Sequence, residues 1–293
     1  MTSQTELNLA PLPALLIDAA VEAALKEDLG RAGDITSQAT VPAAARAQAV
    51  LRARDDGRVA GLDLARCAFR LMDPGLQIAV VHGDGQDVRP GDVIAAVEGN
   101  ARAILSGERV ALNYLGHLSG IATATRALVR ATEGTKAKIC CTRKTTPGLR
   151  AFEKYAVRAG GGINHRFGLD DGILIKDNHI AVAGGVARAI EAAKGTVGHM
   201  VKIEVEVDTL DQLEEALKIG VDVVLLDNMT PETLAKAVAL IDGRAISEAS
   251  GRVTAERVPA IAGSGVDFIS AGWITHSAPC LDIGLDIDIE PGP

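Results

Sequence analysis

The segment MVKIEVEVDTLDQLEEALKIGVDVVLLDNMTPETLAKAVALIDGRAISEA, residues 200–249, decides the fold. In it, three short apolar runs alternate with two stretches that are typical of amphipathic helices. The apolar runs occupy residues 201–207, 221–227 and 244–249, and the helical stretches occupy 210–220 and 231–241. Because strands that alternate with helices form parallel βα units, the segment predicts part of a parallel sheet.

The same alternation extends in both directions along the chain. Runs typical of strands also occur at 137–142, 172–176 and 266–272, with helical stretches between them. Short connections favour a closed or nearly closed parallel barrel, but six strands are fewer than the eight of a complete (β/α) barrel. Either the barrel is incomplete, or two strands lie outside the recognisable pattern.

Polar residues follow each of the six predicted strands, and parallel barrels carry their active sites at the carboxyl ends of strands. Helix caps and turns would explain one such coincidence, but six in register predict a shared active-site mouth. These residues are Thr142-Arg143-Lys144, Lys176-Asp177-Asn178-His179, Glu206 with Asp208, Asp227-Asn228, Glu248 with Ser250-Gly251, and Ser270 with Gly272.

The charge distribution points to a small anionic ligand. Between Arg143 and Arg166 the chain has six basic residues and a single acid, Glu153, although its formal net charge is -8. A solvated helix face is the simpler explanation for such a run, and a pocket for a multiply anionic molecule is the sharper one. Aromatic residues make up only 2% of the chain. Together with the acidic balance, this disfavours nucleic-acid binding, which needs stacking platforms and a basic face.

Composition also indicates the compartment. The first twenty residues lack the basic start of a secretory signal, and no apolar run is long enough to span a bilayer. The four cysteines form no CxxC pair or metal-binding spacing. We expect a soluble, cytoplasmic protein with reduced thiols and without a membrane partner.

The first third of the chain has a different pattern. Residues 15–30 predict a helix that ends at Gly30, and 47–61 and 88–105 predict strands separated by turns. Residues 107–132 predict a long helix that connects two domains. Its Gly116 and Gly120, four residues apart, would let another element approach closely.

Two carboxylates are the best catalytic candidates. In KIEVEVD, residues 202–208, Lys202, Glu204 and Glu206 share one face of the strand. A Lys202–Glu204 ion pair would account for two of them, which leaves Glu206 near the strand end. Asp227 occupies the same place on the next strand, and Thr230 is better placed than Asp227 to cap the following helix. Such a pair of carboxylates suits Mg²⁺, ribose hydroxyls or a developing positive charge.

The stretch GGGINHRFGLDDGILIKDNHI, residues 160–180, is the densest in candidate residues. His165 beside Arg166 in a glycine-rich loop favours an anion contact. Lys176 suits either a phosphate contact or, if desolvated, a Schiff base, and His179 has no assignable role. EASGRVT (248–254) and GSGVDFISAG (263–272) are typical of the phosphate-binding loops on the last two strands of a barrel.

These motifs resemble the quinolinate phosphoribosyltransferase family over nearly the whole chain. The matching segments are ALKEDLGRAGDIT (24–36), GERVALNYLGHLSGIAT (107–123), TRKTTPGLR (142–150), the 160–180 stretch, KIEVEVD, VLLDNM (224–229), EASG (248–251) and ISAGWITHSAPCLDIGLD (269–286). The resemblance implies an N-terminal α/β open sandwich domain, residues 1–112, and an incomplete TIM-like α/β barrel, residues 113–277. Residues 278–293 are expected to complete the N-terminal sheet.

The resemblance also implies the reaction. A phosphoribosyl group passes from phosphoribosyl pyrophosphate to quinolinate, giving nicotinate mononucleotide, pyrophosphate and CO₂ in NAD biosynthesis. The implied enzyme is a pentosyltransferase that uses Mg²⁺. It forms a homodimer or a higher oligomer.

Site residues carry over by motif. For quinolinate they are Arg143, His165, Arg166, Lys144 and Lys176, with Arg109 supplied across the dimer interface. For phosphoribosyl pyrophosphate they are Lys144, Lys176, Glu206, Asp227, Ser250, Gly251, Arg252, Gly272 and His276. The catalytic set is Lys144, Lys176, Glu206 and Asp227, and the last two hold the metal directly or through pyrophosphate or water. Arg252 stands where the family often has Gly or Asn, which puts the backbone contact there in question.

Three other functions fit parts of the pattern. A related phosphoribosyltransferase acting without decarboxylation would use similar loops, but an arginine-rich pocket suits two carboxylates better. A Schiff-base aldolase would use Lys176 as its nucleophile, although the surrounding cations disfavour this. A non-catalytic anion sensor would gain nothing from the carboxylates at the strand ends.

Overall fold

The computed structural model describes residues 9–289, and the side chains of residues up to 287. The chain divides into two compact units. The N-terminal unit contains the described residues up to Arg126, the segment Ala151–Gly161 and the residues from Ser277 onward. The barrel unit contains Ala127–Arg150 and Gly162–His276. The boundary expected between residues 112 and 113 falls inside helix α4 (Ala101–Ala131), and the division into domains stays a prediction.

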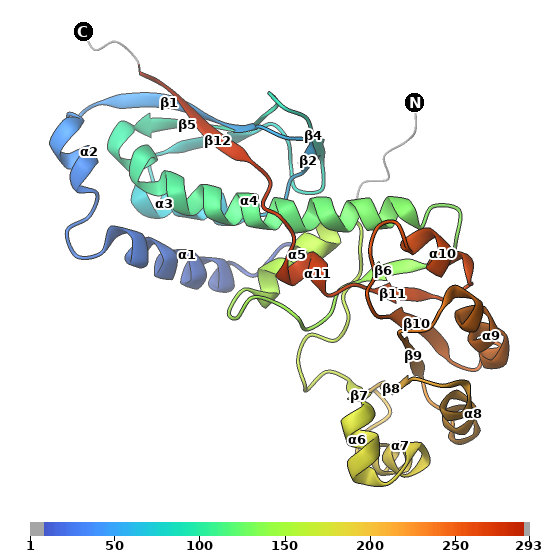
Figure 1. Cartoon of the computed structure of the whole chain (residues 1–293). Coiled ribbons are helices and arrows are strands. Elements are labelled where there is room, and N and C mark those ends of the chain that lie inside the picture. Colours follow the sequence, from blue (N-terminus) through green and yellow to red (C-terminus); the bar gives the residue numbers. More distant parts are fainter. Residues whose placement is uncertain (1–8, 290–293) are drawn as a thin grey trace. The chain divides into compact units, whose positions relative to one another are not determined.

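The N-terminal unit is built on a four-stranded antiparallel sheet with the order β12-β1-β5-β3. Its strands are β1 (Arg46–Ala53), β3 (Gln77–Val80), β5 (Val93–Asn100) and β12 (Ile283–Ile289), and a separate small sheet pairs β2 (Gly57–Arg58) with β4 (Asp87–Val88). Its helices are α1 (Ala14–Leu29), α2 (Ile35–Thr40), α3 (Leu62–Met72), the part of α4 up to Arg126 and most of α5 (Arg150–Ala159). Figure 1 shows α1, α3 and α4 on one side of this sheet.

The C-terminal strand closes one edge of the N-terminal sheet. β12 pairs with β1 antiparallel, from Ala47 opposite Ile289 to Ala53 opposite Ile283. In Figure 1 the red end of the chain therefore lies beside the blue strand β1. The path to β12 crosses α4 at its small residues. A Cβ at Gly120 would lie 2.0 Å from the Pro279 carbonyl oxygen, which confirms that glycine allows a close approach there.

The barrel unit is a six-stranded sheet in which every pair of neighbours is parallel, with the order β6-β11-β10-β9-β8-β7. The strands are β6 (Lys138–Cys140), β7 (Ile173–Ile175), β8 (Ile203–Val207), β9 (Val223–Asp227), β10 (Ile246–Ser250) and β11 (Phe268–Ser270). The helices are α6 (Asp177–Ala183), α7 (Val186–Lys194), α8 (Leu210–Ile219), α9 (Pro231–Ile241), α10 (Val258–Gly263) and α11 (Trp273–His276).

All six predicted strands are confirmed. Within residues 9–289 no further strand extends this sheet, although Ile163 makes an isolated parallel bridge to Cys140 of β6, and the incomplete-barrel alternative is the correct one. The expected α/β class, with a separate antiparallel sheet domain, is confirmed as well. Among the described residues, no helix is both long enough and apolar enough to cross a membrane.

Two local predictions were wrong. The strand expected over residues 88–105 ends at Asn100, and α4 begins at Ala101 instead of residue 107. The expected Lys202–Glu204 ion pair is absent among the described residues, because Lys202 Nζ contacts Asp222 Oδ1 at 2.7 Å. Thr230 caps α9 as predicted, since its side chain accepts a hydrogen bond from the Thr233 backbone.

Candidate active site

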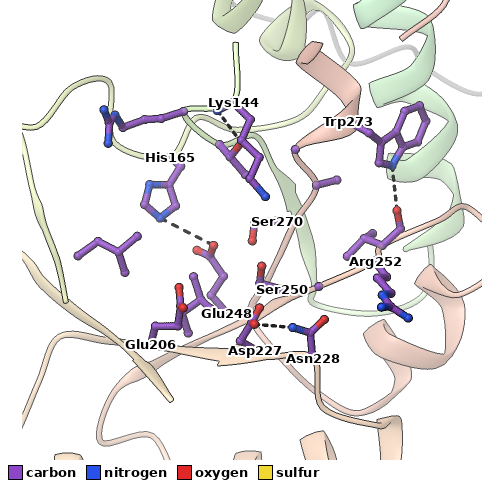
Figure 2. Close-up of a pocket in the computed structure, with 18 of the residues that line it drawn as sticks. Lys144, His165, Glu206, Asp227, Asn228, Glu248, Ser250, Arg252, Ser270 and Trp273 are labelled. Carbon is purple, nitrogen blue, oxygen red and sulfur yellow. Dashed lines mark hydrogen bonds and ion pairs between the residues drawn. The ribbon is translucent and has the colours of Figure 1, made fainter. Parts of the chain in front are cut away.

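A cavity of about 670 Å³ lies at the carboxyl ends of the barrel strands. It is lined entirely by residues of the barrel unit, and Figure 2 shows labelled side chains from separate strands converging on it. It brings together twelve of the predicted site residues: Arg143, Lys144, His165, Arg166, Lys176, Glu206, Asp227, Ser250, Gly251, Arg252, Gly272 and His276. Arg109 is not in this lining and lies in α4, in the N-terminal unit.

Strand alternation explains why carboxylates face the cavity. Ile203, Val205 and Val207 of β8 are all buried hydrophobic residues on one face of the strand. Glu204 and Glu206 therefore lie on the opposite face, which is the interior of the barrel. Glu206 is near the carboxyl end of β8 and lines the cavity, as does Asp227 at the end of β9.

Lys176, which follows β7, forms an ion pair with Glu206 of the neighbouring strand β8. Its Nζ lies 2.7 Å from Glu206 Oε2, and its side chain is 46% exposed. A Schiff-base lysine must be desolvated to lose its proton, so this ion pair and this exposure disfavour the aldolase alternative. His179 acquires a structural role, because its Nδ1 accepts a hydrogen bond of 2.9 Å from the Lys176 backbone N–H at the start of α6.

Arg143 and Arg166 form the cationic part of the pocket. Among the described residues, the Nε atoms of both are buried and have no hydrogen-bond partner. Burial lowers the pKa of the Arg166 guanidinium, and the positive charge of Arg143 lowers it further. Buried donors without acceptors are costly, so the arrangement is suited to an anion that satisfies both guanidinium groups.

Lys144 is positioned by its backbone. Its N–H donates to Thr142 Oγ1 at 3.0 Å, and its carbonyl accepts from Thr275 Oγ1 at 2.7 Å. Gly272 is needed beside it, because a Cβ there would lie 2.9 Å from Lys144 Cδ and 3.3 Å from Thr142 Oγ1. These contacts tie the end of β6 to the loop after β11.

The loops after β9 and β10 share a strained backbone. Asn228, after β9, and Arg252, after β10, have positive φ angles of 53° and 45°, and Gly251 next to Arg252 has a φ of 102°. The Asn228 N–H donates to the Ser250 carbonyl at 2.9 Å, and its side-chain amide donates to Asp227. Non-glycine residues in this region are uncommon and tend to occur at functional sites. Arg252 thus takes the left-handed conformation that a Gly or Asn would adopt more easily.

Sequence reasoning gave no role to two buried carboxylates. Glu248 was among the polar residues at strand ends, and Glu204 was taken as a partner of Lys202. Both are buried, and His165 Nε2 lies 2.8 Å from Glu204 Oε2 and 3.8 Å from Glu248 Oε1. Figure 2 shows the His165 ring directed at the Glu248 carboxylate. Their inward positions could be read from the alternation in IEVEV and ISEAS, but their partner could not.

The pKa of Glu248 is raised to about 7, chiefly by burial and secondly by the negative charge of Glu204. A hydrogen bond with Ser270 opposes this rise, and a positive charge on His165 would oppose it if the ring were protonated. A carboxyl group with a pKa near neutrality inside a cleft is a feature of functional sites, although structural networks also produce it.

Models of two domain families match the chain. "Quinolinate phosphoribosyl transferase, N-terminal domain" covers residues 34–119, and "Quinolinate phosphoribosyl transferase, C-terminal domain" covers residues 121–286. Curated proteins with the name nicotinate-nucleotide pyrophosphorylase [carboxylating] are also similar. The Bacillus subtilis protein, named as probable, is 48% identical over 90% of this chain and 91% of its own length. The Mycobacterium leprae protein is 44% identical over 91% and 95%, respectively.

Solved structures agree with these matches over almost the whole length. NadC from Streptococcus pyogenes is 40% identical, with a TM-score of 0.93 over 96% of this chain and 100% of that chain. The nicotinate-nucleotide pyrophosphorylase from Francisella tularensis is 39% identical, with a TM-score of 0.91 over 96% and 99%. On these grounds the chain belongs to the quinolinate phosphoribosyltransferase family.

Proposed function

We propose that the protein transfers a phosphoribosyl group from phosphoribosyl pyrophosphate to quinolinate, with loss of CO₂, and so makes nicotinate mononucleotide for NAD biosynthesis. Its similarity to carboxylating nicotinate-nucleotide pyrophosphorylases supports this reaction. The observation that carries the proposal is the pair of buried Nε donors of Arg143 and Arg166, which lack partners among the described residues. Quinolinate has two adjacent carboxylates that would satisfy both guanidinium groups.

The quinolinate end of the pocket consists of Arg143, Arg166 and Lys144. Arg166 is oriented by the hydrogen bond of 2.8 Å that its Nη1 donates to the Gly172 carbonyl. Guanidinium groups bind carboxylates through two parallel hydrogen bonds, which fix the orientation of the ring. Two positive groups held together without an anion repel each other, so a dianion gains affinity from relieving this repulsion.

The phosphoribosyl pyrophosphate end consists of the loops after β9, β10 and β11. We assign the 5′-phosphate to the loops that carry Ser250, Gly251 and Gly272, with His276 and Arg252 beside them. Glu206 and Asp227 then face the ribose, and Lys144 and Lys176 lie between the two substrates. The glycines leave backbone N–H groups accessible to phosphate oxygens.

Glu206 and Asp227 are suited to Mg²⁺ that arrives with pyrophosphate. Carboxylate oxygens are the donors that Mg²⁺ prefers, and this ion is commonly bound by one or two carboxylates together with substrate phosphates. Glu206 is also paired with Lys176, and Asp227 accepts from Asn228, so each retains only part of its acceptor capacity. This arrangement favours the contact through water or pyrophosphate. Bound Mg²⁺ would neutralise the pyrophosphate leaving group.

The residues of the pocket then stabilise successive charges. When the bond between C1′ and the pyrophosphate oxygen breaks, both electrons leave with pyrophosphate and positive charge develops on the ribose, which Glu206 and Asp227 stabilise. The quinolinate nitrogen lone pair forms the new bond to C1′ and makes a pyridinium. The ring then accepts the electrons of the bond between C2 and its carboxylate, CO₂ leaves, and C2 takes up a proton.

We further propose that the active enzyme is a cytoplasmic homodimer, or a higher oligomer built from such dimers, in which Arg109 of the partner subunit completes the quinolinate site. Closed symmetric oligomers are the commonest assemblies of soluble enzymes. The position of Arg109 outside the pocket lining of its own chain is compatible with this arrangement.

The test is an assay with quinolinate labelled in its 2-carboxylate, phosphoribosyl pyrophosphate and Mg²⁺. We expect labelled CO₂ and a product with the mass of nicotinate mononucleotide. The Arg143→Ala variant should fold normally but raise the KM for quinolinate by about 30-fold or more, since losing one partner of a buried charged contact costs about 2 kcal/mol or more.

Two results would contradict the proposal. A product that retains both carboxylates would identify a non-decarboxylating phosphoribosyltransferase. An unchanged quinolinate KM in Arg143→Ala would refute the assignment of that residue. Borohydride trapping with a sugar phosphate should leave Lys176 unmodified, and a trapped adduct would instead support the aldolase alternative.

A further inference from the structure

Another cavity, of about 290 Å³, lies at the amino ends of the barrel strands and shares His165, Arg166 and Glu248 with the active-site pocket. Glu204 of β8 and Glu248 of β10 line it and are only 6% and 4% exposed. Among the described residues, Oε1 of each is buried without a hydrogen-bond partner. Two buried carboxyl groups in one cavity are unfavourable, so their retention beside the pocket requires an explanation.

The hydrogen bonds of His165 determine its tautomer. The backbone N–H of Arg166 donates to His165 Nδ1 at 2.8 Å, so Nδ1 carries a lone pair and no proton. The proton of the neutral ring is therefore on Nε2, which lies 2.8 Å from Glu204 Oε2 and donates to it. Neither ring nitrogen is left to contact a substrate in this arrangement.

The same tautomer disfavours a metal at this cluster. His165, Glu204 and Glu248 each offer one ligand atom, and these atoms lie within 4.8 Å of one another. A metal would need the lone pair of the nitrogen that faces the carboxylates. That nitrogen is Nε2. It carries the ring proton, and so has no lone pair, as long as Nδ1 accepts the backbone N–H. The two carboxylates therefore interact with the protonated Nε2 instead of with a metal ion.

We propose that Glu204 and Glu248 are positioning residues that fix the His165 ring, and that the ring in turn fixes the backbone of Arg166. Glu204 accepts a hydrogen bond from the Nε2 proton, and the Glu248 carboxylate, 3.8 Å from Nε2, further restricts the ring. Quinolinate is then bound by the Arg166 guanidinium, whose position depends on this backbone. The part concerning quinolinate depends on the proposed function, whereas the tautomer does not.

The kinetic test compares Glu204→Ala with Glu204→Gln. Alanine removes the acceptor, so we expect the KM for quinolinate to rise about tenfold or more while the KM for phosphoribosyl pyrophosphate stays unchanged, because small displacements of a binding group cost this much. Glutamine keeps an acceptor oxygen and should restore most of the affinity. Equal effects on both substrates, or no rescue by glutamine, would overturn the proposal.

A second histidine–glutamate pair provides the control. His117 Nε2 lies 2.9 Å from Glu153 Oε1, Glu153 is fully buried, and both residues belong to the N-terminal unit. Glu153→Gln should lower the melting temperature and leave the KM for quinolinate unchanged. If it raises that KM as much as Glu204→Ala does, the effect at Glu204 is general loss of packing and the proposal fails.

The tautomer can be measured without substrate. ¹⁵N NMR of the histidine-labelled protein, with His165→Asn to assign the signal, should show a neutral His165 with its proton on Nε2. In Glu204→Ala the signal should move towards a mixture of tautomers. A proton on Nδ1, or a shift of the His165 signal on addition of Zn²⁺ or Mn²⁺ that Glu204→Ala abolishes, would overturn the proposal. If instead the protein releases no CO₂ from quinolinate but the ¹⁵N signal of His165 is as expected, only the proposed function is refuted.

Discussion

At the scale of single residues, Gly251 illustrates how the proposed phosphate loop after β10 depends on the absence of a side chain. Its φ of 102° already disfavours other residues, and a Cβ there would lie 2.2 Å from Asn228 Oδ1. Since Asn228 also donates to Asp227, the clash would displace a predicted catalytic carboxylate together with the loop. Glycine at this position thus allows the loop proposed to bind phosphate to pack against Asn228, which holds the carboxylate proposed to face the ribose.

Gly251→Ala should therefore weaken phosphoribosyl pyrophosphate binding more than quinolinate binding. We expect its kcat/KM for phosphoribosyl pyrophosphate to fall about 5- to 150-fold, from roughly 1–3 kcal/mol of strain. The matched control is Gly243→Ala, where φ is 71° but a Cβ would meet nothing within 4 Å. The prediction fails if steady-state kinetics show the two variants to be equally active.

Residues near strand ends were predictable because sequence position alone places them. Lys176 and Asp227 end apolar runs and Glu206 is the next-to-last residue of β8, and parallel strands bring such ends to one edge. Glu204 was misread because its partner is remote. The nearest cation in the sequence is Lys202, but the contact is with His165, 39 residues away. Local sequence carries no information on such a pairing.

At the scale of elements, the positions of the strands in the sequence were predictable, but their order in the sheet was not. Each strand of the barrel is a short apolar run, whereas the order β6-β11-β10-β9-β8-β7 depends on how the sheet curves. The early start of α4 had a sequence signal that was missed. Asn100 Oδ1 accepts from the Ala103 N–H, which is the hydrogen bond of a helix N-cap, and Asn is a favoured residue there.

Strand β10, which lies one strand away from β8 in the sheet, makes a pH-dependent contribution to stability through Glu248. Its pKa is raised from 4.5 to about 7 in the folded protein, so the folded state binds the proton more tightly than the unfolded state. The contribution to stability is fully present below about pH 4.5 and is lost as the pH rises through about 7. A neutral His165 would leave the rise in the Glu248 pKa less opposed.

Glu248→Gln, which is neutral at every pH, should remove this dependence. We expect the melting temperature of the wild type to fall relative to that of the variant between pH 5 and pH 8, measured by calorimetry in matched buffers. Titrating groups that do not interact with Glu248 are common to both proteins and cancel in the difference. A difference that stays constant over this range would show that Glu248 does not titrate there.

At the scale of the whole molecule, residues far apart in sequence build each unit. The last described strand, β12, pairs with β1 near the start of the chain, and the pocket collects residues from Thr142 to His276. One predicted quinolinate contact, Arg109, is provided by α4 of the N-terminal unit. The proposed homodimer assigns this arginine to the site of the partner subunit.

Two inactive variants should complement each other. In a dimer of one Arg109→Ala chain and one Arg143→Ala chain, one site receives both substitutions and the other receives neither. Random reassortment of equal amounts makes half of the dimers mixed, so we expect about a quarter of wild-type activity. The measurement is the quinolinate assay after the mixed chains have been unfolded and refolded together. Activity no higher than that of either variant alone would mean that Arg109 and Arg143 of the same chain serve one site.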